Sequence, residues 1–576
     1  MIIKDEKHIL TLFLLFSFSI PWVYAETTTQ WSIQEIQLTA RDDYPWWEFP
    51  AQAVFVHESG RQITVKAFWN GKRNWIVRYT PTLPGQWTFR ILSDDPGMKH
   101  VAGRFTAIAP TKRQTESQPN YRGHIRISKN KRFFEYANGT PLLLMADTVW
   151  AINTARCGLG ENQDGPFYQY LVDRKAKGFN TILMSYMRGF GDTPNEIAGH
   201  RNEGGYPFVE GEISRMNPAY FHFLDVRMQA LWNHGFVCAV HPTWFGKRGQ
   251  CFFDLTWAKR ISAYLAVRYG AFNAIWSLSG EYQGGMRDCN WSTGDMNELG
   301  ETVQTHNPYS HPLSVHPGSG YYPGDPHRQQ SSAGAFHQQK WLDHNWLQLG
   351  QSSKRIFQIP IRCQNDYDRT PVKPVFCSEA YYEQSAEMEP DHAYYSRWQL
   401  WTALLNGAIG YGYGADGIWQ FYDPNDPNNE TGFSRKNKAS LWQNAIHLEG
   451  SRQIRHLDDC FSKFAWWNLA PCRDWLFLES GTQNPMPNTN DISPPHCAKI
   501  PGELYIMYIP KGNEKTRISI CDFELESFQA RWFNPRNGNE QIITETSAVD
   551  RILQIPVRPQ PAHEDWVFIA QSTYPQ

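Results

Sequence analysis

Two glutamates each follow a short apolar run of the kind that forms a buried strand. Glu281 ends the segment AIWSLSGE, and Glu379 ends the segment PVFCSE. If both segments are parallel strands of one barrel, their carboxylates emerge at the same rim, where barrel enzymes place their chemistry. Two carboxyl groups that face one cleft are the machinery of glycoside hydrolysis. The pair therefore predicts cleavage of a glycosidic bond.

Each glutamate alone also has a plain structural interpretation, because a Glu at a strand end can be exposed or can pair with a base such as Arg188. The place of each glutamate in the order of the predicted strands favours the catalytic interpretation. In many retaining barrel glycosidases the acid/base follows strand four and the nucleophile follows strand seven. Glu281 and Glu379 follow the fourth and seventh of eight predicted strands, so we predict these two roles for them.

The elements that must position these glutamates alternate between strands and helices from residue 122 to residue 465, which is the pattern of a parallel α/β fold. Eight strands are predicted, the number that a closed (β/α)8 TIM barrel requires. They cover residues 141–147, 181–187, 236–244, 274–281, 313–316, 341–347, 374–379 and 409–419. Helical patterns fill most of the connections, but those around 332–340 and 352–373 are irregular.

Both flanks of the barrel contain short alternating segments separated by turn residues. Asn70-Gly71 and Asn537-Gly538 are strong hairpin signals. Residues 26–110 and 466–576 are each predicted to form an antiparallel β-sandwich, and the polar residues 111–121 a linker. The predicted fold class is thus multidomain, with a central TIM barrel between two β-sandwiches.

Polar or aromatic residues occupy nearly every predicted strand end, as a sugar-binding cleft would require. Sugar hydroxyls need hydrogen-bonding groups, and the apolar faces of sugar rings stack on flat aromatic rings. A tryptophan can equally fill a core, so both interpretations stay open for each one. The residues predicted to bind substrate are Asp147, Trp150, Tyr186, Arg188, His241, Trp244, His316, Trp341, Asp343, Tyr382 and Trp419.

The charge and the N-terminus restrict the class of protein. A formal net charge of -2 argues against nucleic acid as a partner. Lys4 and Lys7 precede an apolar stretch at 9–20, and a break at Pro21 and the segment Val23-Tyr24-Ala25 follow, so residues 1–25 are predicted to be a signal peptide cleaved after Ala25. We expect a secreted, periplasmic or cell-surface protein without membrane insertion after cleavage; an uncleaved anchor is the alternative.

Ten cysteines are present, and none has the CxxC spacing of a zinc or redox site. Cys238 and Cys377 lie inside predicted strands and are expected to be buried thiols. In an exported protein some of the others can form disulfides, and four that cluster late in the chain are candidates for bridging, with the pairing left open: Cys460, Cys472, Cys497 and Cys521.

No cofactor and no metal are expected from the motifs. His306, His311 and His316 lack the i, i+4 spacing of helical metal ligands. Neither an HExxH motif nor a Gly-rich phosphate loop occurs. Gly412 and Gly414 lack the third glycine of a nucleotide motif and are predicted to let strand eight approach its neighbours closely.

Seven motifs occur in order across the predicted barrel: residues 147–150, 177–180, 268–270, 275–281, 341–343, 378–383 and 407–414. Together they resemble the apiosidase-like barrel family of glycoside hydrolases. The segment from residue 68 to Trp87 resembles the immunoglobulin-like domain that precedes such barrels. Residues 532–538 and 565–568 resemble a C-terminal β domain of collagen-binding type.

The resemblance implies a retaining barrel with Glu281 as acid/base and Glu379 as nucleophile. Apiosidases carry Asp at the acid/base position, so the Glu of this chain puts apiose specificity in doubt. We predict an exported hydrolase of a plant- or algal-type polysaccharide or oligosaccharide. The alternative is a non-catalytic glycan- or collagen-binding protein on an inactive barrel; a collagen-cleaving metalloenzyme is disfavoured because the zinc motif is absent. The oligomeric state is left open.

Overall fold

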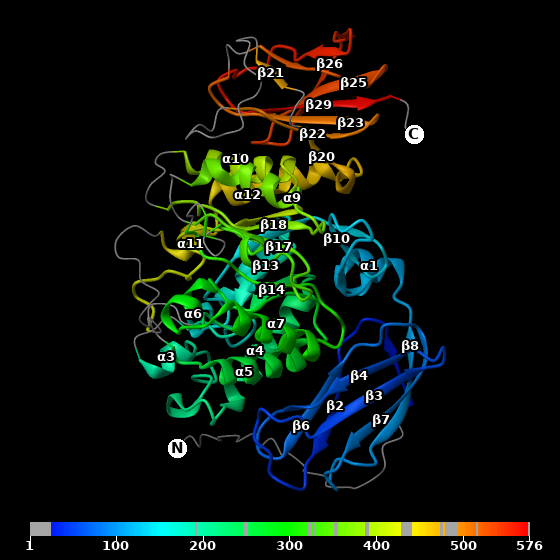
Figure 1. The fold of residues 1–576 in the computed structure, drawn as a ribbon, viewed down its shortest axis with the longest axis vertical. Coiled ribbons are helices and arrows are strands. Elements are labelled where there is room, and N and C mark those ends of the chain that lie inside the picture. The colour runs from blue at the N-terminus through cyan, green and yellow to red at the C-terminus, as the bar shows by residue number, and fades with distance from the viewer. Residues whose placement is uncertain are drawn as a thin grey trace, which may run out of the picture.

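The computed structural model describes residues 25–189, 193–245, 251–320, 324–325, 329–350, 355–385, 391–427, 440–472, 476–478, 494–513 and 517–573. The predicted signal peptide lies outside these residues, except for Ala25. Figure 1 shows a central barrel with one β-sandwich below it and a second one above it. The predicted architecture of a TIM-type barrel between two sandwiches is confirmed.

The barrel is an eight-stranded sheet in which every hydrogen-bonded pair of neighbouring strands is parallel. Its order is β16-β15-β14-β13-β12-β19-β18-β17. The strands are β12 (Leu144–Thr148), β13 (Thr181–Ser185), β14 (Val237–His241), β15 (Ala274–Ser277), β16 (Leu313–Ser314), β17 (Asn345–Gln348), β18 (Val375–Glu379) and β19 (Gly410–Tyr413). All eight predicted strands are present in the predicted order.

The gap between β16 and β17 is closed by bonds that are not part of the strand ladder. The backbone N–H of Asp343 donates to the carbonyl of Leu313 at 2.7 Å, and the Leu313 N–H donates to Asp343 Oδ2 at 2.9 Å. Ser314 Oγ donates to the carbonyl of His344 at 2.7 Å. These bonds join the two ends of the sheet, so its eight strands form a nearly closed ring.

Helices surround the strands, and α4, which precedes β14, begins as its sequence predicts. Asn217 caps α4 by accepting from the Ala219 N–H at 3.1 Å, and Pro218 occupies the first turn. The irregular connections hold the short α8 and the nine-residue α9. The helices are α2 (Pro166–Ala176), α3 (Pro194–Ala198), α4 (Pro218–Asn233), α5 (Leu255–Tyr269), α6 (Gln283–Asp288), α7 (Thr293–His306), α8 (Ala333–Phe336), α9 (Ile359–Tyr367), α10 (His392–Leu405), α11 (Trp442–Ala445) and α12 (Glu449–Phe461).

The N-terminal sandwich consists of a five-stranded and a three-stranded sheet. Their strands are β1 (Ala25–Thr29), β8 (Ala102–Ile108), β7 (Gly85–Ser93), β3 (Ala51–His57) and β4 (Gln62–Lys66), then β2 (Gln34–Thr39), β6 (Asn74–Tyr79) and β5 (Phe68–Trp69). All pairs are antiparallel except β1 with β8. Arg78 of β6 fixes the sandwich to the barrel, because it donates to Asp225 of α4 and to the carbonyl of Arg268, both at 2.8 Å.

The predicted linker at 111–121 is an ordered connection. Thr111 and Gln114 form a capping box at α1 (Lys112–Ser117). In the following turn, Asn120 is buried and donates to the carbonyls of Trp232 and Phe236, at 3.0 and 3.2 Å. A small sheet of β9 (Ile125–Ile127), β10 (Phe134–Tyr136) and β11 (Pro141–Leu142) then leads into the barrel.

The C-terminal sandwich has a six-stranded sheet and a four-stranded sheet. Its strands are β20 (Ala470–Cys472), β22 (His496–Ile500), β23 (Leu504–Ile509), β29 (Trp566–Ser572), β25 (Phe528–Phe533) and β26 (Glu540–Ile543), then β21 (Leu476–Leu478), β24 (Ile518–Ile520), β28 (Ile552–Gln554) and β27 (Ala548–Val549). Helices α10 and α12 lie between this domain and the barrel strands (Figure 1). Trp401 of α10 stacks on Tyr508 of β23, with ring centroids 6.1 Å apart.

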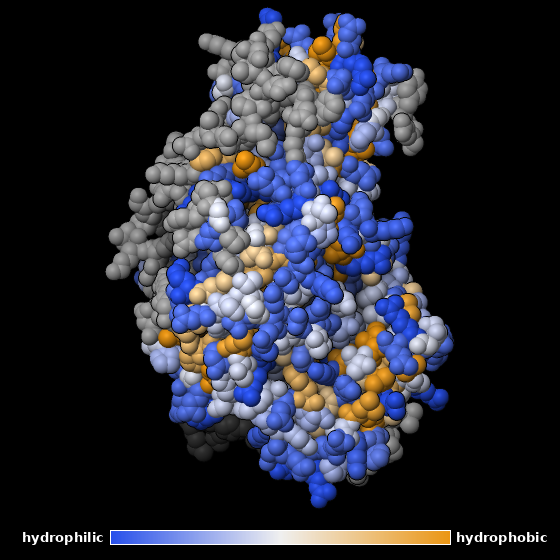
Figure 2. All heavy atoms as spheres, in the orientation of Figure 1, coloured by the Kyte–Doolittle hydropathy of each residue, from blue (hydrophilic) through white to orange (hydrophobic). Residues whose placement is uncertain are grey.

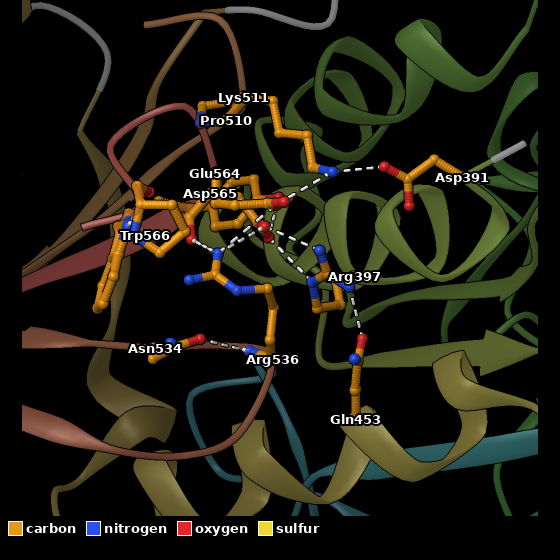
Figure 3. Close-up of polar contacts among 12 residues, drawn as sticks. Asp391, Arg397, Gln453, Pro510, Lys511, Asn534, Arg536, Glu564, Asp565 and Trp566 are labelled. Carbon is orange, nitrogen blue, oxygen red and sulfur yellow. Dashed lines mark hydrogen bonds and ion pairs between the residues drawn. The ribbon is translucent and has the colours of Figure 1, made fainter. Parts of the chain in front are cut away.

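A buried ion cluster fastens this sandwich to α10 (Figure 3). Asp565 is fully buried and accepts from Arg397 Nη2 at 2.8 Å and from Nε at 3.0 Å. Tyr508 also donates to it at 3.0 Å, and Arg536 donates at 3.3 Å. Burial opposes ionisation of Asp565, but Arg397, Arg536 and the Tyr508 hydroxyl together outweigh it and hold the pKa of this carboxyl below its ordinary value.

One disulfide is present among the described residues and joins Cys251 to Cys289. Cys238 and Cys377 are buried free thiols, as predicted. The late cysteines Cys460, Cys472, Cys497 and Cys521 are also free, so the suggested bridging among them is not realised.

The visible surface is mostly hydrophilic, with hydrophobic residues in separate small groups (Figure 2). Within the part of the chain that the structure describes, no helix has the length and apolar character needed to cross a bilayer.

Candidate active site

Glu379 ends β18, whose five residues are all buried. Its side chain is 9% exposed. Tyr382, in the loop that follows, donates its hydroxyl to Glu379 Oε1 at 2.8 Å. His316, which follows β16, places Nε2 3.2 Å from Oε2. Each carboxylate oxygen thus has a polar neighbour from a different part of the rim, and this fixes the direction in which the group points.

Tyr382 is itself oriented by Trp150, which follows β12. Trp150 Nε1 donates to the Tyr382 hydroxyl oxygen at 3.0 Å. An indole N–H can only donate, so the Tyr382 proton is left for Glu379. Gly414 makes room for the ring, because a Cβ at this glycine would lie 2.2 Å from Tyr382 Cδ1. A Cβ at Gly412 would lie 1.7 Å from the Ser378 carbonyl oxygen, which confirms the predicted close approach of strand eight.

Glu281 lies on the turn after β15 and is held in an unusual backbone conformation. Its φ is +43°, in the left-handed region that costs an L-residue roughly 1–2 kcal/mol. Gly280 packs beneath Trp244, whose Cε2 would lie 2.5 Å from a Cβ at this position. Glu281 Oε1 accepts a bond of 3.1 Å from Nε2 of Gln348. The turn and this bond together direct the Glu281 side chain.

Four predicted substrate-binding residues pack together beside Glu379. Trp150 and Trp244 meet edge to face at 4.7 Å, and His241 lies 4.3 Å from Trp244 and 5.2 Å from Trp150, between ring centroids. His316 lies 5.8 Å from Trp150. Each of the four is at most 5% exposed, so they form a tight wall rather than open stacking platforms.

Arg188 and Trp419 form a second contact near this wall. The Arg188 guanidinium lies 5.4 Å from the centre of the Trp419 ring, and its Nη1 lies 3.3 Å from His200 Nε2. The Trp419 carbonyl accepts from the Ala151 N–H at 3.0 Å, next to Trp150. The structure therefore brings Arg188 and Trp419 to the same side of the rim as Trp150.

Asp147 and Tyr186 lie elsewhere, which corrects their prediction as substrate-binding residues. Asp147 is fully buried and accepts from Tyr170 at 2.8 Å and from Arg174 Nε at 2.5 Å, both on α2. Burial raises its pKa against the opposing effect of Arg174. Tyr186 stacks on Tyr269 at the end of α5, with centroids 4.6 Å apart. Asp147 faces α2, because successive residues of a strand point to opposite faces, and Tyr186, which follows β13, packs among Tyr269 and Trp276.

Trp341 and Asp343 also lie away from the rim, because β17 begins at Asn345 and not at residue 341. Trp341 covers Gly300 of α7 and donates to Asn297 Oδ1 at 3.0 Å. Asp343 belongs to the bonds that close the sheet at the amino ends of the strands, and burial raises its pKa to about 6. Neither residue is retained as substrate-binding.

Gln348 is a site residue that the sequence reasoning missed. It ends β17, is 3% exposed and contacts Glu281. The signal that could have found it is the polar Gln directly after the apolar pair Trp346-Leu347. The predicted strand ended one residue too early to include it.

Within the described ranges, no group of three or more His, Cys, Asp and Glu side chains is placed to hold an ion. His306 lies against Lys66, with 2.9 Å between the nitrogens, and His311 contacts the carbonyl of Gly270 at 2.8 Å. These two histidines therefore do not join His316 beside Glu379.

Three family models match the chain. The one described as "Apiosidase-like, catalytic domain" matches residues 128–468, which is more than half of the chain. A domain of unknown function (DUF5060) matches residues 27–94, and the "Putative collagen-binding domain of a collagenase" matches residues 486–571. The comparison with curated proteins gives no match.

Solved structures share the fold at low sequence identity. A putative glycoside hydrolase from Bacteroides vulgatus is 17% identical, with a TM-score of 0.67 over 95% of this chain and 99% of that one. A glycoside hydrolase family 5 structure from the same organism is 19% identical, with a TM-score of 0.63 over 79% of this chain and 95% of that one. A further structure, described as "Glycoside hydrolase", is 18% identical, with a TM-score of 0.64 over 79% of this chain and 98% of that one.

Proposed function

Because the chain belongs to the apiosidase-like catalytic-domain family of glycoside hydrolases, we propose that Glu379 and Glu281 cleave a glycosidic bond by a retaining mechanism. Support comes from Glu379, whose two carboxylate oxygens are approached by Tyr382 and His316 from different sides. A nucleophile needs a fixed line of attack, and these contacts provide one.

In the first step, a Glu379 oxygen bonds to the anomeric carbon while the bond from that carbon to the leaving oxygen breaks. Glu281 gives its proton to the leaving oxygen. In the second step, water gives a proton to Glu281 and attacks the anomeric carbon, which releases Glu379. Tyr382 and Trp150 keep Glu379 oriented in both steps, since their bonds do not involve the reacting proton.

We propose a plant- or algal-type polysaccharide, or its oligosaccharides, as the substrate. The wall of Trp150, Trp244, His241 and His316 beside Glu379 supports a sugar, because its imidazole nitrogens suit sugar hydroxyls and its closely packed rings give the site a rigid side. Glu281 has one methylene more than the Asp of apiosidases, so apiose specificity is not carried over into this proposal.

Export is part of the same proposal. Residues 1–25 carry the features of a cleaved signal peptide, and the disulfide between Cys251 and Cys289 supports an oxidising compartment. We place the mature domains at residues 26–110, 122–465 and 466–576, with 111–121 as the connection.

The test is hydrolysis of a glycan panel by the wild type, Glu281→Ala and Glu379→Gln. We expect the wild type to release sugar from at least one glycan and both variants to lose most of that activity. Circular dichroism checks that the variants are folded. Equal turnover by all three proteins would contradict the assignment. A glycan that binds to the folded wild type without turnover would instead support the non-catalytic alternative.

A further inference from the structure

We propose that Gln348 is a positioning residue that sets the orientation and the proton affinity of Glu281, a role that rests on the proposed function of the two glutamates. Gln348 contacts both catalytic strand ends. Its side chain donates to Glu281, and its backbone is the register partner of Glu379.

The local backbone explains how one residue reaches both glutamates. Leu347 pairs with Cys377, but the next residue, Gln348, pairs with Glu379, so the register skips Ser378. Irregularities of this kind redirect a side chain and are frequent next to active sites. At the skipped position the side chain of Ser378 bonds across the two strands, because its Oγ donates to the Leu347 carbonyl at 2.6 Å.

Backbone bonds on both sides hold Gln348 in this register. Its own N–H donates to the Gln330 carbonyl at 3.0 Å, and the N–H of Leu349 donates to the Glu379 carbonyl at 2.9 Å. The side chain is 3% exposed, so its rotamers are restricted by packing. Because its backbone is fixed against the Glu379 strand and its side chain bonds to Glu281, Gln348 holds Glu281 in a fixed place relative to that strand.

The amide group suits a carboxyl group that must change its protonation state. The Gln348 NH2 must face Glu281 Oε1, because two facing oxygens would repel one another. This bond directs Oε1, and the positive charge of Arg287 on α6 also acts on the Glu281 carboxyl. A donor to a carboxylate favours the ionised form. A neutral amide does so less strongly than a lysine or arginine would, and so still permits the protonated form that the first step needs.

The substitution Gln348→Met tests this role, because methionine has a similar length and no N–H donor. Gln364→Met is the matched control. Gln364 is also buried, and donates to Asn406 on the helical side of the barrel, away from both glutamates. Both variants lose one amide bond, so a general effect of that loss on the fold would be common to them.

The first measurement needs no substrate. Protein labelled with carboxyl-13C glutamate is titrated by NMR, and the Glu281 signal is assigned by its absence in Glu281→Gln. We expect the titration midpoint of Glu281 to move to higher pH in Gln348→Met and to stay at the wild-type value in Gln364→Met. A midpoint that is unchanged in Gln348→Met would overturn the proposal.

The second measurement uses aryl and alkyl glycosides of a sugar that the wild type cleaves. A displaced acid matters only when the leaving group needs a proton. We therefore expect kcat in Gln348→Met to fall about 100-fold for the alkyl glycoside and to change little for the dinitrophenyl glycoside. Equal losses for both would contradict the role. If the wild type cleaves nothing, the proposed function fails, while the titration still decides the placement of Gln348.

Discussion

Removal of the Asp565 carboxylate should strongly destabilise the attachment of the C-terminal sandwich. In Asp565→Ala, Arg397 would keep its charge, because a guanidinium does not lose its proton in proteins. Its side chain is only 4% exposed, so water cannot replace the lost partner. Tyr508 would lose the same acceptor. So would Arg536, which lies beside Asp565 in Figure 3.

The expected magnitude follows from this burial. Loss of one partner from a buried ion pair costs about 3–5 kcal/mol, because the remaining charge is uncompensated. Lys511, which contacts Asp391 and Glu564 at the edge of the same cluster, provides the control. Its side chain is 27% exposed and that of Asp391 is 44% exposed, so Lys511→Ala should cost about 0–1 kcal/mol.

Urea unfolding followed by tryptophan fluorescence measures both variants, since Trp401 stacks on Tyr508 at this interface. At neutral pH we expect the first unfolding transition of Asp565→Ala to lose several kcal/mol and that of Lys511→Ala to lose little. Because the folded-state pKa of Asp565 is lowered, its contribution is complete above the ordinary value of 3.8 and is lost as the pH falls through the lower folded-state value. Equal, small losses in the two variants would refute the reasoning.

Two further predictions concern the barrel. Gly414→Ala should push the Tyr382 ring away from Glu379, because the new Cβ would lie 2.2 Å from the ring. We expect kcat on a cleaved glycan to fall by about 100-fold. Wild-type kcat in a folded variant would contradict this. His311 is fully buried 4.6 Å from His124, and burial lowers its pKa from 6.5 to about 4. The unfolded chain therefore binds more protons between those values, so stability should rise with pH across this window by up to about 3 kcal/mol. Thermal unfolding of the wild type and His311→Gln measures the effect, and equal slopes would exclude His311 as its source.

The order of the eight strands could be predicted because each is a short apolar run between polar turns. The direction of individual side chains could not. All five residues of β12 and all five of β13 are buried, so no polar alternation marks which side chains face the barrel interior. For this reason the sequence pattern places Asp147 and Tyr186 at the rim, although Asp147 bonds to α2 and Tyr186 packs on Tyr269.

The position of β17 was missed for a different reason. Trp341 and Leu342 extend the apolar pattern toward the N-terminus, but they pack before the strand begins at Asn345. This shift hid Gln348, whose pairing with Glu379 also depends on an irregular register that no local pattern specifies. The disulfide between Cys251 and Cys289 was likewise not predictable, because its partners are 38 residues apart and meet only in the folded chain.

The anomeric configuration of azide products tests the central claim, the division of roles between Glu379 and Glu281, most directly. In Glu379→Ala, azide would attack the anomeric carbon of an activated glycoside in a single displacement, and we predict a glycosyl azide of inverted configuration by NMR. In Glu281→Ala, azide would intercept the glycosyl-enzyme, and two displacements give the retained configuration. A retained azide product from Glu379→Ala and an inverted one from Glu281→Ala would contradict the account. So would the absence of an azide product from both variants when the wild type is active.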